Sequence, residues 1–155
     1  MNLEKWASLA EIISGIAVVV TLIFLVVGIR ENSDIMRASS FTSATDSLIE
    51  LNRDIMADGE LAEIFEAWAA NDTSQLDPQQ RARLNQMAVA LFRIYEKAFL
   101  AERYGLLGPG EWRRFERTIC LIYPRLRSDG LEAPVRTALT DEFVQFVDTR
   151  CSASN

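Results

Sequence analysis

The densest group of side chains that could bind a ligand is a set of five arginines between positions 113 and 127. A guanidinium group donates several hydrogen bonds in a fixed fork, which suits phosphate and anionic lipid headgroups. The candidate residues for such a contact are Arg113, Arg114, Arg117, Arg125 and Arg127. The alternative is a solvated face on which these arginines pair with nearby carboxylates such as Glu111 and Glu116.

The other reactive groups do not form a pattern typical of catalysis. The chain has no histidine, which excludes Ser–His–Asp and Cys–His catalysis and metal sites built on imidazole. Two cysteines are too few for a disulfide scaffold or a four-thiolate metal site. Cys120 lies in an apolar run typical of a core position, and Cys151 lies near the end, where residues 151–155 are expected to fray. We therefore expect no enzyme activity, catalytic residue, cofactor or metal.

Residues 12–29 form an uncharged apolar segment, IISGIAVVVTLIFLVVGI. As a helix it would be about 27 Å long, close to the roughly 30 Å hydrocarbon thickness of a bilayer. A helix also pairs its own backbone groups, whereas an isolated strand in lipid would not. A buried helix of a soluble protein and a cleaved signal peptide are the alternatives. We predict an uncleaved membrane anchor over residues 1–30.

The charges beside this segment predict its orientation. Lys5 precedes the segment, and Arg30 and Arg37 follow it. Because basic residues accumulate on the cytoplasmic side, this small excess favours a cytoplasmic location for residues 31–155. Trp6 would act as an aromatic anchor at the opposite interface.

One side of the predicted membrane helix is formed mostly by small residues. Small side chains let the backbones of membrane helices approach closely, which favours self-association. The residues of this predicted oligomer seam are Ala7, Ala10, Ser14, Ala17, Thr21 and Gly28. Glu4 and Glu11 lie near one end of the seam and could form the mouth of a small pore, although a carboxylate so close to the interface can also simply reach water.

The remainder of the chain, residues 31–155, is predicted to be a compact bundle of about five helices, into which the membrane helix continues. Gly59 is a plausible break, and a short helix follows it. Asp77-Pro78 then marks the start of a central helix, with Asp77 as its N-cap. A fourth helix is expected to stop at Tyr123-Pro124, a loop to cover residues 126–133, and Thr140 to cap a last helix.

Charge is divided unevenly along this part of the chain. Residues 31–80 carry 2 basic and 11 acidic side chains, whereas residues 81–155 carry 12 basic and 9 acidic ones. The two halves could therefore attract each other, or each could form its own solvated face. The whole chain has a net charge of −6, which argues against nucleic-acid binding.

Three short motifs resemble those of a large group of uncharacterised bacterial single-span membrane proteins with a C-terminal helical domain. Residues 21–25 and 28–33, TLIFL and GIRENS, are similar to that group's "SLIYL" and "QIRxNT". Residues 104–107 with 111–113 resemble its helix break and next-helix start, and residues 140–148 resemble its closing "SPEFRAYVD". The resemblance covers about residues 10–148 and implies a protein of the bacterial inner membrane with an anchored, cytoplasmic helical domain. It implies no activity.

These observations predict an all-α, homo-oligomeric membrane protein that acts as a scaffold or partner-binding module. Its expected partners are the lipid bilayer, other copies of the chain and a further membrane protein. A small ion-conducting pore and an auxiliary subunit of a larger membrane complex are the alternative functions.

Overall fold

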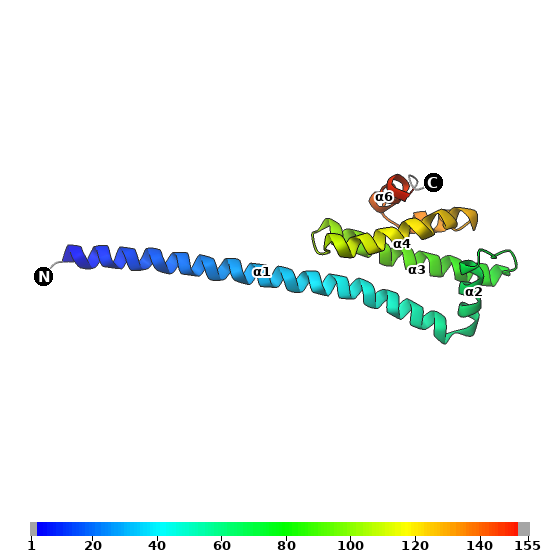
Figure 1. Ribbon diagram of the computed structural model, residues 1–155, viewed down its shortest axis with the longest axis horizontal. Helices are drawn as coiled ribbons and strands as arrows, with labels where there is room; N and C mark the ends of the chain where they lie inside the picture. The colour runs from blue at the N-terminus through cyan, green and yellow to red at the C-terminus, as the bar shows by residue number, and fades with distance from the viewer. Residues whose placement is uncertain (1–2, 152–155) are drawn as a thin grey trace. The chain divides into compact units, whose positions relative to one another are not determined.

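The structure, a computed structural model, describes residues 3–151 and, within that range, the side chains of residue 11 and residues 13–151. The described residues form six helices joined by short turns, and they include no strand. This confirms the predicted all-α fold with one long apolar helix at the N-terminus followed by a helical bundle (Figure 1). The bounds of the helices are α1 Leu3–Ala57, α2 Gly59–Ala69, α3 Pro78–Arg103, α4 Pro109–Ser128, α5 Glu132–Ala138 and α6 Asp141–Cys151.

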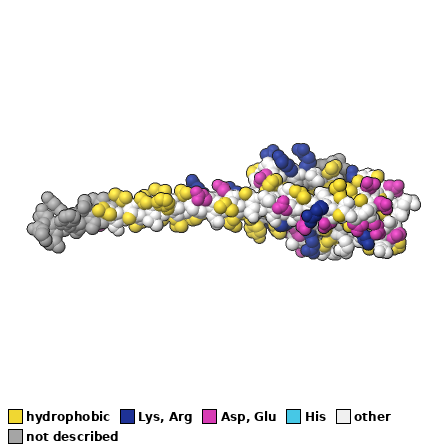
Figure 2. Space-filling model, turned by 90° about the horizontal axis from the view of Figure 1, so that it is seen from below, with side chains coloured by type: hydrophobic (Ala, Val, Ile, Leu, Met, Phe, Trp, Pro, Cys, Tyr) yellow, Lys and Arg dark blue, Asp and Glu magenta, His cyan; other side chains and the backbone are white. Residues whose placement is uncertain are grey.

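The chain divides into two compact units, Met1–Met36 and Arg37–Asn155. The first part of α1 belongs to the first unit, and its side chains between residues 13 and 30 are all exposed. Figure 2 shows hydrophobic side chains along this stretch. Helix α1 is the one described helix that is long and apolar enough to cross a bilayer. The part of the chain that the structure describes therefore contains a single candidate membrane span, as the sequence predicts.

The second unit starts with the remainder of α1 and turns at Asp58 into α2. Asp58 is extended, and its carboxylate accepts hydrogen bonds from the backbone N–H groups of Glu60 and Leu61. These N–H groups have no partner within the helix, so the carboxylate satisfies them and fixes the start of α2. The predicted break at Gly59 is correct, because α1 ends at Ala57 and α2 begins at Gly59.

Helix α3 is the central helix of the second unit. Asp77 caps it as predicted: its carboxylate accepts from the N–H groups of Gln79 and Gln80, and Gln80 Oε1 accepts from the N–H of Asp77. The helix contacts α2, α4 and α5, and Figure 1 shows α4 running alongside it. Eight of its side chains are buried in the core: Leu84, Met87, Ala88, Leu91, Phe92, Tyr95, Ala98 and Phe99.

Helix α4 runs through Pro124 to Ser128, so the prediction that it stops at Tyr123-Pro124 is wrong. Proline removes one backbone N–H and costs about 3 kcal/mol inside a helix. Here burial offsets that cost, since Tyr123 and Leu126 lie on either side of Pro124 and are 7% and 0% exposed. The helix ends instead before Asp129-Gly130, where Gly130 has a φ of +71°, a conformation that favours glycine.

The predicted loop over residues 126–133 is also wrong at both ends. Its first residues belong to α4, and its last two belong to the short helix α5, whose Val135 is fully buried. Thr140 directly precedes α6 as predicted, but its hydroxyl donates a 2.7 Å hydrogen bond to Glu96 Oε1 on α3. Its backbone N–H donates to the same oxygen, so this residue ties the start of α6 to α3.

The core of the second unit is rich in aromatic side chains. Phe99 on α3 lies 5.3 Å from Phe143 and 5.0 Å from Phe146 on α6, measured between ring centroids. Trp112 on α4 lies 5.5 Å from Phe146 and completes the cluster. These side chains hold α3, α4 and α6 together and give α6 a fixed position on the bundle.

Candidate functional site

The predicted oligomer seam lies on the exposed first part of α1. Ser14, Ala17, Thr21 and Gly28 are all exposed, and a Cβ added to Gly28 would meet no atom within 4 Å. The Thr21 hydroxyl donates a 2.8 Å hydrogen bond to the carbonyl oxygen of Ala17, so this polar group is satisfied within its own helix. The side chains of Ala7 and Ala10 lie outside the described residues. The described part of the seam is therefore open for contact with another helix.

The predicted pore mouth rests on two carboxylates. Glu11 is exposed, and the side chain of Glu4 lies outside the described residues. The proposed pore stays a prediction, because it depends on an assembly of several copies.

The five arginines of the predicted anion site do not share one surface. At 100° per residue, side chains four positions apart lie on one helix face, whereas neighbours do not. Arg113 and Arg117 accordingly line the same groove, while Arg114 lines a separate cavity of about 210 Å³ with Phe41 and Tyr95. Arg127 points elsewhere and pairs with Glu132 at 2.9 Å. Arg125 is half-buried and lines neither space.

We call the first of these spaces the α4–α6 groove. It has a volume of about 660 Å³ and is lined by Arg113, Glu116, Arg117, Cys120, Leu121 and Arg150. Three of these six side chains are guanidinium groups, and only one is a carboxylate. Leu121 is 65% exposed and gives the groove an apolar portion. Arg150 on α6 was not among the predicted residues, because it is distant from the others in sequence.

Two of the groove arginines already have partners. Arg150 Nε lies 3.3 Å from Glu116 Oε1, and Arg113 Nε donates a 3.2 Å hydrogen bond to the carbonyl oxygen of Pro109. Arg117 is exposed and forms no ion pair with any side chain that the structure describes. The groove therefore has a net positive charge and one guanidinium with its donors directed to solvent or a ligand.

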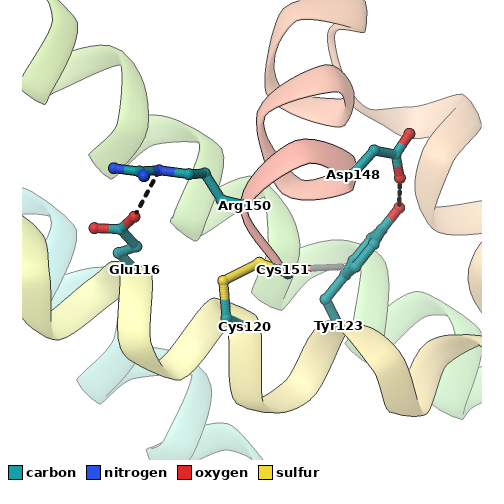
Figure 3. Close-up of a disulfide and its surroundings, with 6 residues drawn as sticks. All are labelled: Glu116, Cys120, Tyr123, Asp148, Arg150 and Cys151. Atoms are coloured by element: carbon teal, nitrogen blue, oxygen red, sulfur yellow. Dashed lines mark hydrogen bonds and ion pairs between the residues drawn. A yellow bond between two sulfur atoms is a disulfide. The ribbon is translucent and has the colours of Figure 1, made fainter. Parts of the chain in front are cut away.

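The interface between α4 and α6 is fastened by three contacts on successive turns of α4 (Figure 3). Glu116 pairs with Arg150, Cys120 forms a disulfide with Cys151, and the Tyr123 hydroxyl donates a 2.8 Å hydrogen bond to Asp148 Oδ1. The two cysteines, which were interpreted separately from the sequence, are joined by the structure in one disulfide, with Cys120 partly buried against the core. Cys151 is 4% exposed and ends α6, so the prediction that fraying begins at this residue is wrong.

Asp148 is also the centre of an ionic network that joins α4, α5 and α6. Arg136 donates from Nη1 and Nη2 to the two Asp148 oxygens, at 2.7 and 2.9 Å. These hydrogen bonds lower the pKa of Asp148, and hydrogen bonds from Arg127 lower the pKa of Glu132. Burial raises the pKa of Tyr123 to about 12, and its hydrogen bond to Asp148 adds to that rise. The network is a structural connection, since its groups satisfy one another.

Charged side chains of the two halves of the chain meet at Arg83. Arg83 on α3 lies 3.0 Å from Glu60 Oε2 and 3.6 Å from Asp58 Oδ2. The Trp68 indole N–H donates a 3.0 Å hydrogen bond to Asp129 Oδ2. Within the described residues, no group of three or more acidic or sulfur ligands could hold a metal ion.

No protein-family model, curated protein or solved structure matches this chain. The resemblance to single-span bacterial membrane proteins therefore stays a prediction.

Proposed function

We propose that this chain is a homo-oligomeric single-span membrane protein whose helical bundle acts as a scaffold or partner-binding module. The observation that carries the proposal is the exposed apolar part of α1. Twelve large apolar side chains between Ile13 and Ile29 are each 44–75% exposed. This surface has to be covered by lipid, by other protein or by both.

The size of this surface favours lipid. Full burial of one large apolar side chain contributes about 1.5–3 kcal/mol. Twelve such side chains, each about half exposed, would therefore gain on the order of 10–20 kcal/mol from an apolar environment. That equals or exceeds the net stability of a typical domain, about 5–15 kcal/mol. A bilayer supplies this environment over the whole length of the segment.

Self-association is proposed to use the small-residue seam. Leu, Ile and Val cover most of the remaining helix surface, and lipid solvates these side chains as well as another helix does. Only the small residues allow two backbones to approach closely. Ala17 lies at the centre of the described seam, and Val19 lies on the opposite side of the helix.

A pair of matched variants tests the seam. We expect Ala17→Leu to lower the mass of the full-length protein in mild detergent or nanodiscs to that of a monomer or smaller oligomer. Val19→Leu enlarges a side chain on the opposite side and should leave the mass unchanged. A monomeric wild-type protein, or equal effects of both variants, would contradict self-association through the seam.

We propose the α4–α6 groove as the binding surface of the module, with an anionic phospholipid headgroup as its ligand. Arg113, Arg117 and Arg150 supply charge-assisted donors for a phosphate group, and the exposed Leu121 can contact an acyl chain. Glu116 limits the affinity, because it already pairs with Arg150.

Native mass spectrometry of the full-length protein with a short-chain phosphatidylglycerol tests this assignment. We expect Arg113→Gln combined with Arg117→Gln to reduce lipid binding at least tenfold. Arg93→Gln combined with Arg125→Gln removes the same charge outside the groove and should change binding little. Inorganic phosphate tests whether the headgroup alone suffices. Equal losses of lipid binding in both double variants would show nonspecific charge attraction and would refute the α4–α6 groove as the binding site.

A further inference from the structure

The disulfide occupies the middle of a well-packed helix interface. Cys120 lies between Glu116 and Tyr123 on α4, and each of these neighbours contacts α6. The Cα atoms of Cys120 and Cys151 are 4.7 Å apart, across 31 positions of sequence. The packing of α6 thus brings together the only two cysteines of the chain.

The two cysteines are unequally accessible to solvent. Cys151 is 4% exposed, whereas Cys120 is half-buried and lines the α4–α6 groove. An oxidising protein that approaches the folded bundle would therefore reach the Cys120 sulfur first. Cys151 is placed to react only with its neighbour.

We infer that the helical bundle lies on the oxidising, non-cytoplasmic side of the membrane, where a protein thiol–disulfide oxidant joins Cys120 to Cys151. Disulfides persist in oxidising compartments and are kept reduced in the cytosol. This placement is opposite to the one that Arg30 and Arg37 predict. That prediction depends on a difference of only one basic residue between the two flanks.

The reaction consists of two thiol–disulfide exchanges. The Cys120 thiolate attacks a sulfur of the oxidant's disulfide, forming a mixed disulfide and releasing one oxidant thiolate. The Cys151 thiolate then attacks the Cys120 sulfur, closing the Cys120–Cys151 bond and releasing the second. The oxidant thus gains two electrons, takes up the two protons lost by the cysteines and leaves as a dithiol.

The redox state of the full-length chain in a bacterial host tests the inference. Cells are first quenched with acid, which stops thiol–disulfide exchange. Their membranes are then washed with carbonate, and a maleimide polymer labels the free thiols of the chain that remains in the membranes. We expect no adduct before reduction and two adducts after it. A host without its exported thiol oxidant should give two adducts before reduction. Two adducts before reduction in the normal host would overturn the inference.

A trapping variant tests the order of attack. Cys151→Ser should accumulate a mixed disulfide between Cys120 and the oxidant, visible as a larger species that reductant removes. Cys120→Ser leaves only the buried Cys151 and should form at least tenfold less of this species. Equal trapping by the two variants would refute Cys120 as the point of attack.

Orientation is measured separately with Ala70→Cys, which places a thiol on an exposed residue just after α2. A membrane-impermeant maleimide should label this variant in intact spheroplasts, and the wild-type chain controls for the native cysteines. Labelling only after lysis would overturn the inference. The inference rests on the proposed membrane anchor, but the experiment distinguishes the two claims. Release of the chain by carbonate would refute the anchor. Reduced thiols in a chain that stays in the washed membranes would refute only the orientation.

Discussion

Reduction of the disulfide should destabilise the helical bundle without unfolding it. The bond closes a loop with a sequence separation of 31. The chain-entropy relation for a loop of this length gives about 3.7 kcal/mol at 25 °C, mainly because the bond restricts the unfolded chain. For a folded region of this size, that loss lowers the melting temperature by about 10–15 °C.

The fold should persist because other contacts keep α6 in place. The ion pair of Glu116 with Arg150 and the hydrogen bond of Tyr123 to Asp148 do not depend on the disulfide. Phe143 and Val147 on α6 are fully buried in the core. The far-ultraviolet circular dichroism at 25 °C should therefore change little on reduction.

The assay is thermal unfolding of the full-length protein in detergent, followed by tryptophan fluorescence with and without a phosphine reductant. Mass spectrometry confirms complete reduction. The double variant Cys120→Ser with Cys151→Ser is the matched control: it should melt near the reduced wild type and be insensitive to reductant. A fully reduced wild type that melts within about 3 °C of the oxidised protein would refute the reasoning.

Three further predictions concern the bundle. Asp148→Asn should cost about 1–2 kcal/mol at neutral pH, because it breaks a half-exposed charged network. Since the network lowers the pKa of Asp148, its contribution to stability is present above the ordinary pKa of about 4 and is lost as the pH falls further. In urea titrations at acid pH, the free energy of unfolding of the variant should therefore fall less steeply with decreasing pH than that of the wild type. Burial raises the pKa of Tyr95 from 10.0 to about 12, so the stability that the neutral phenol contributes is present below pH 10 and is lost as the pH rises through 12. The free energy of unfolding of Tyr95→Phe should therefore fall less steeply with pH in alkali than that of the wild type. An unchanged pH dependence would contradict this. Asp77→Ala removes the cap of α3 and should cost about 0.5–2 kcal/mol in the free energy of unfolding, whereas Asp72→Ala, in the preceding exposed loop, should cost less.

Features determined by neighbouring residues could be predicted from the sequence. The start of α3 at Asp77-Pro78 and the break at Gly59 each depend on residues within one helical turn. The apolar character of residues 12–29 is likewise a property of consecutive residues. Such signals act through backbone hydrogen bonding and side-chain solvation, which are the same in any fold.

Features that depend on packing were missed. Pro124 was expected to end α4, but the burial of Leu126 extends the helix beyond it. The cysteine pair is separated by 31 positions, and its contact exists only once α6 packs on α4. No spacing rule connects residues that come from two helices joined by a loop and a third helix.

The arginine cluster shows both outcomes within one helix. Arg113 and Arg117 are four positions apart and share the groove, as helical spacing predicts. Arg114 lies on another face, and Arg150 joins the groove from α6. Density of a residue type along the sequence is thus a weaker guide than helical phase, and neither identifies a contribution from a distant helix.

Whether the apolar part of α1 spans a bilayer can be measured by alkaline extraction of membranes containing the full-length chain. We predict that the wild-type chain stays in the membrane pellet. Val19→Arg combined with Ile23→Arg places two charges within the apolar segment that persist at alkaline pH, and it should release the chain to the supernatant. Recovery of the wild-type chain in the supernatant without detergent would show that α1 does not span a bilayer.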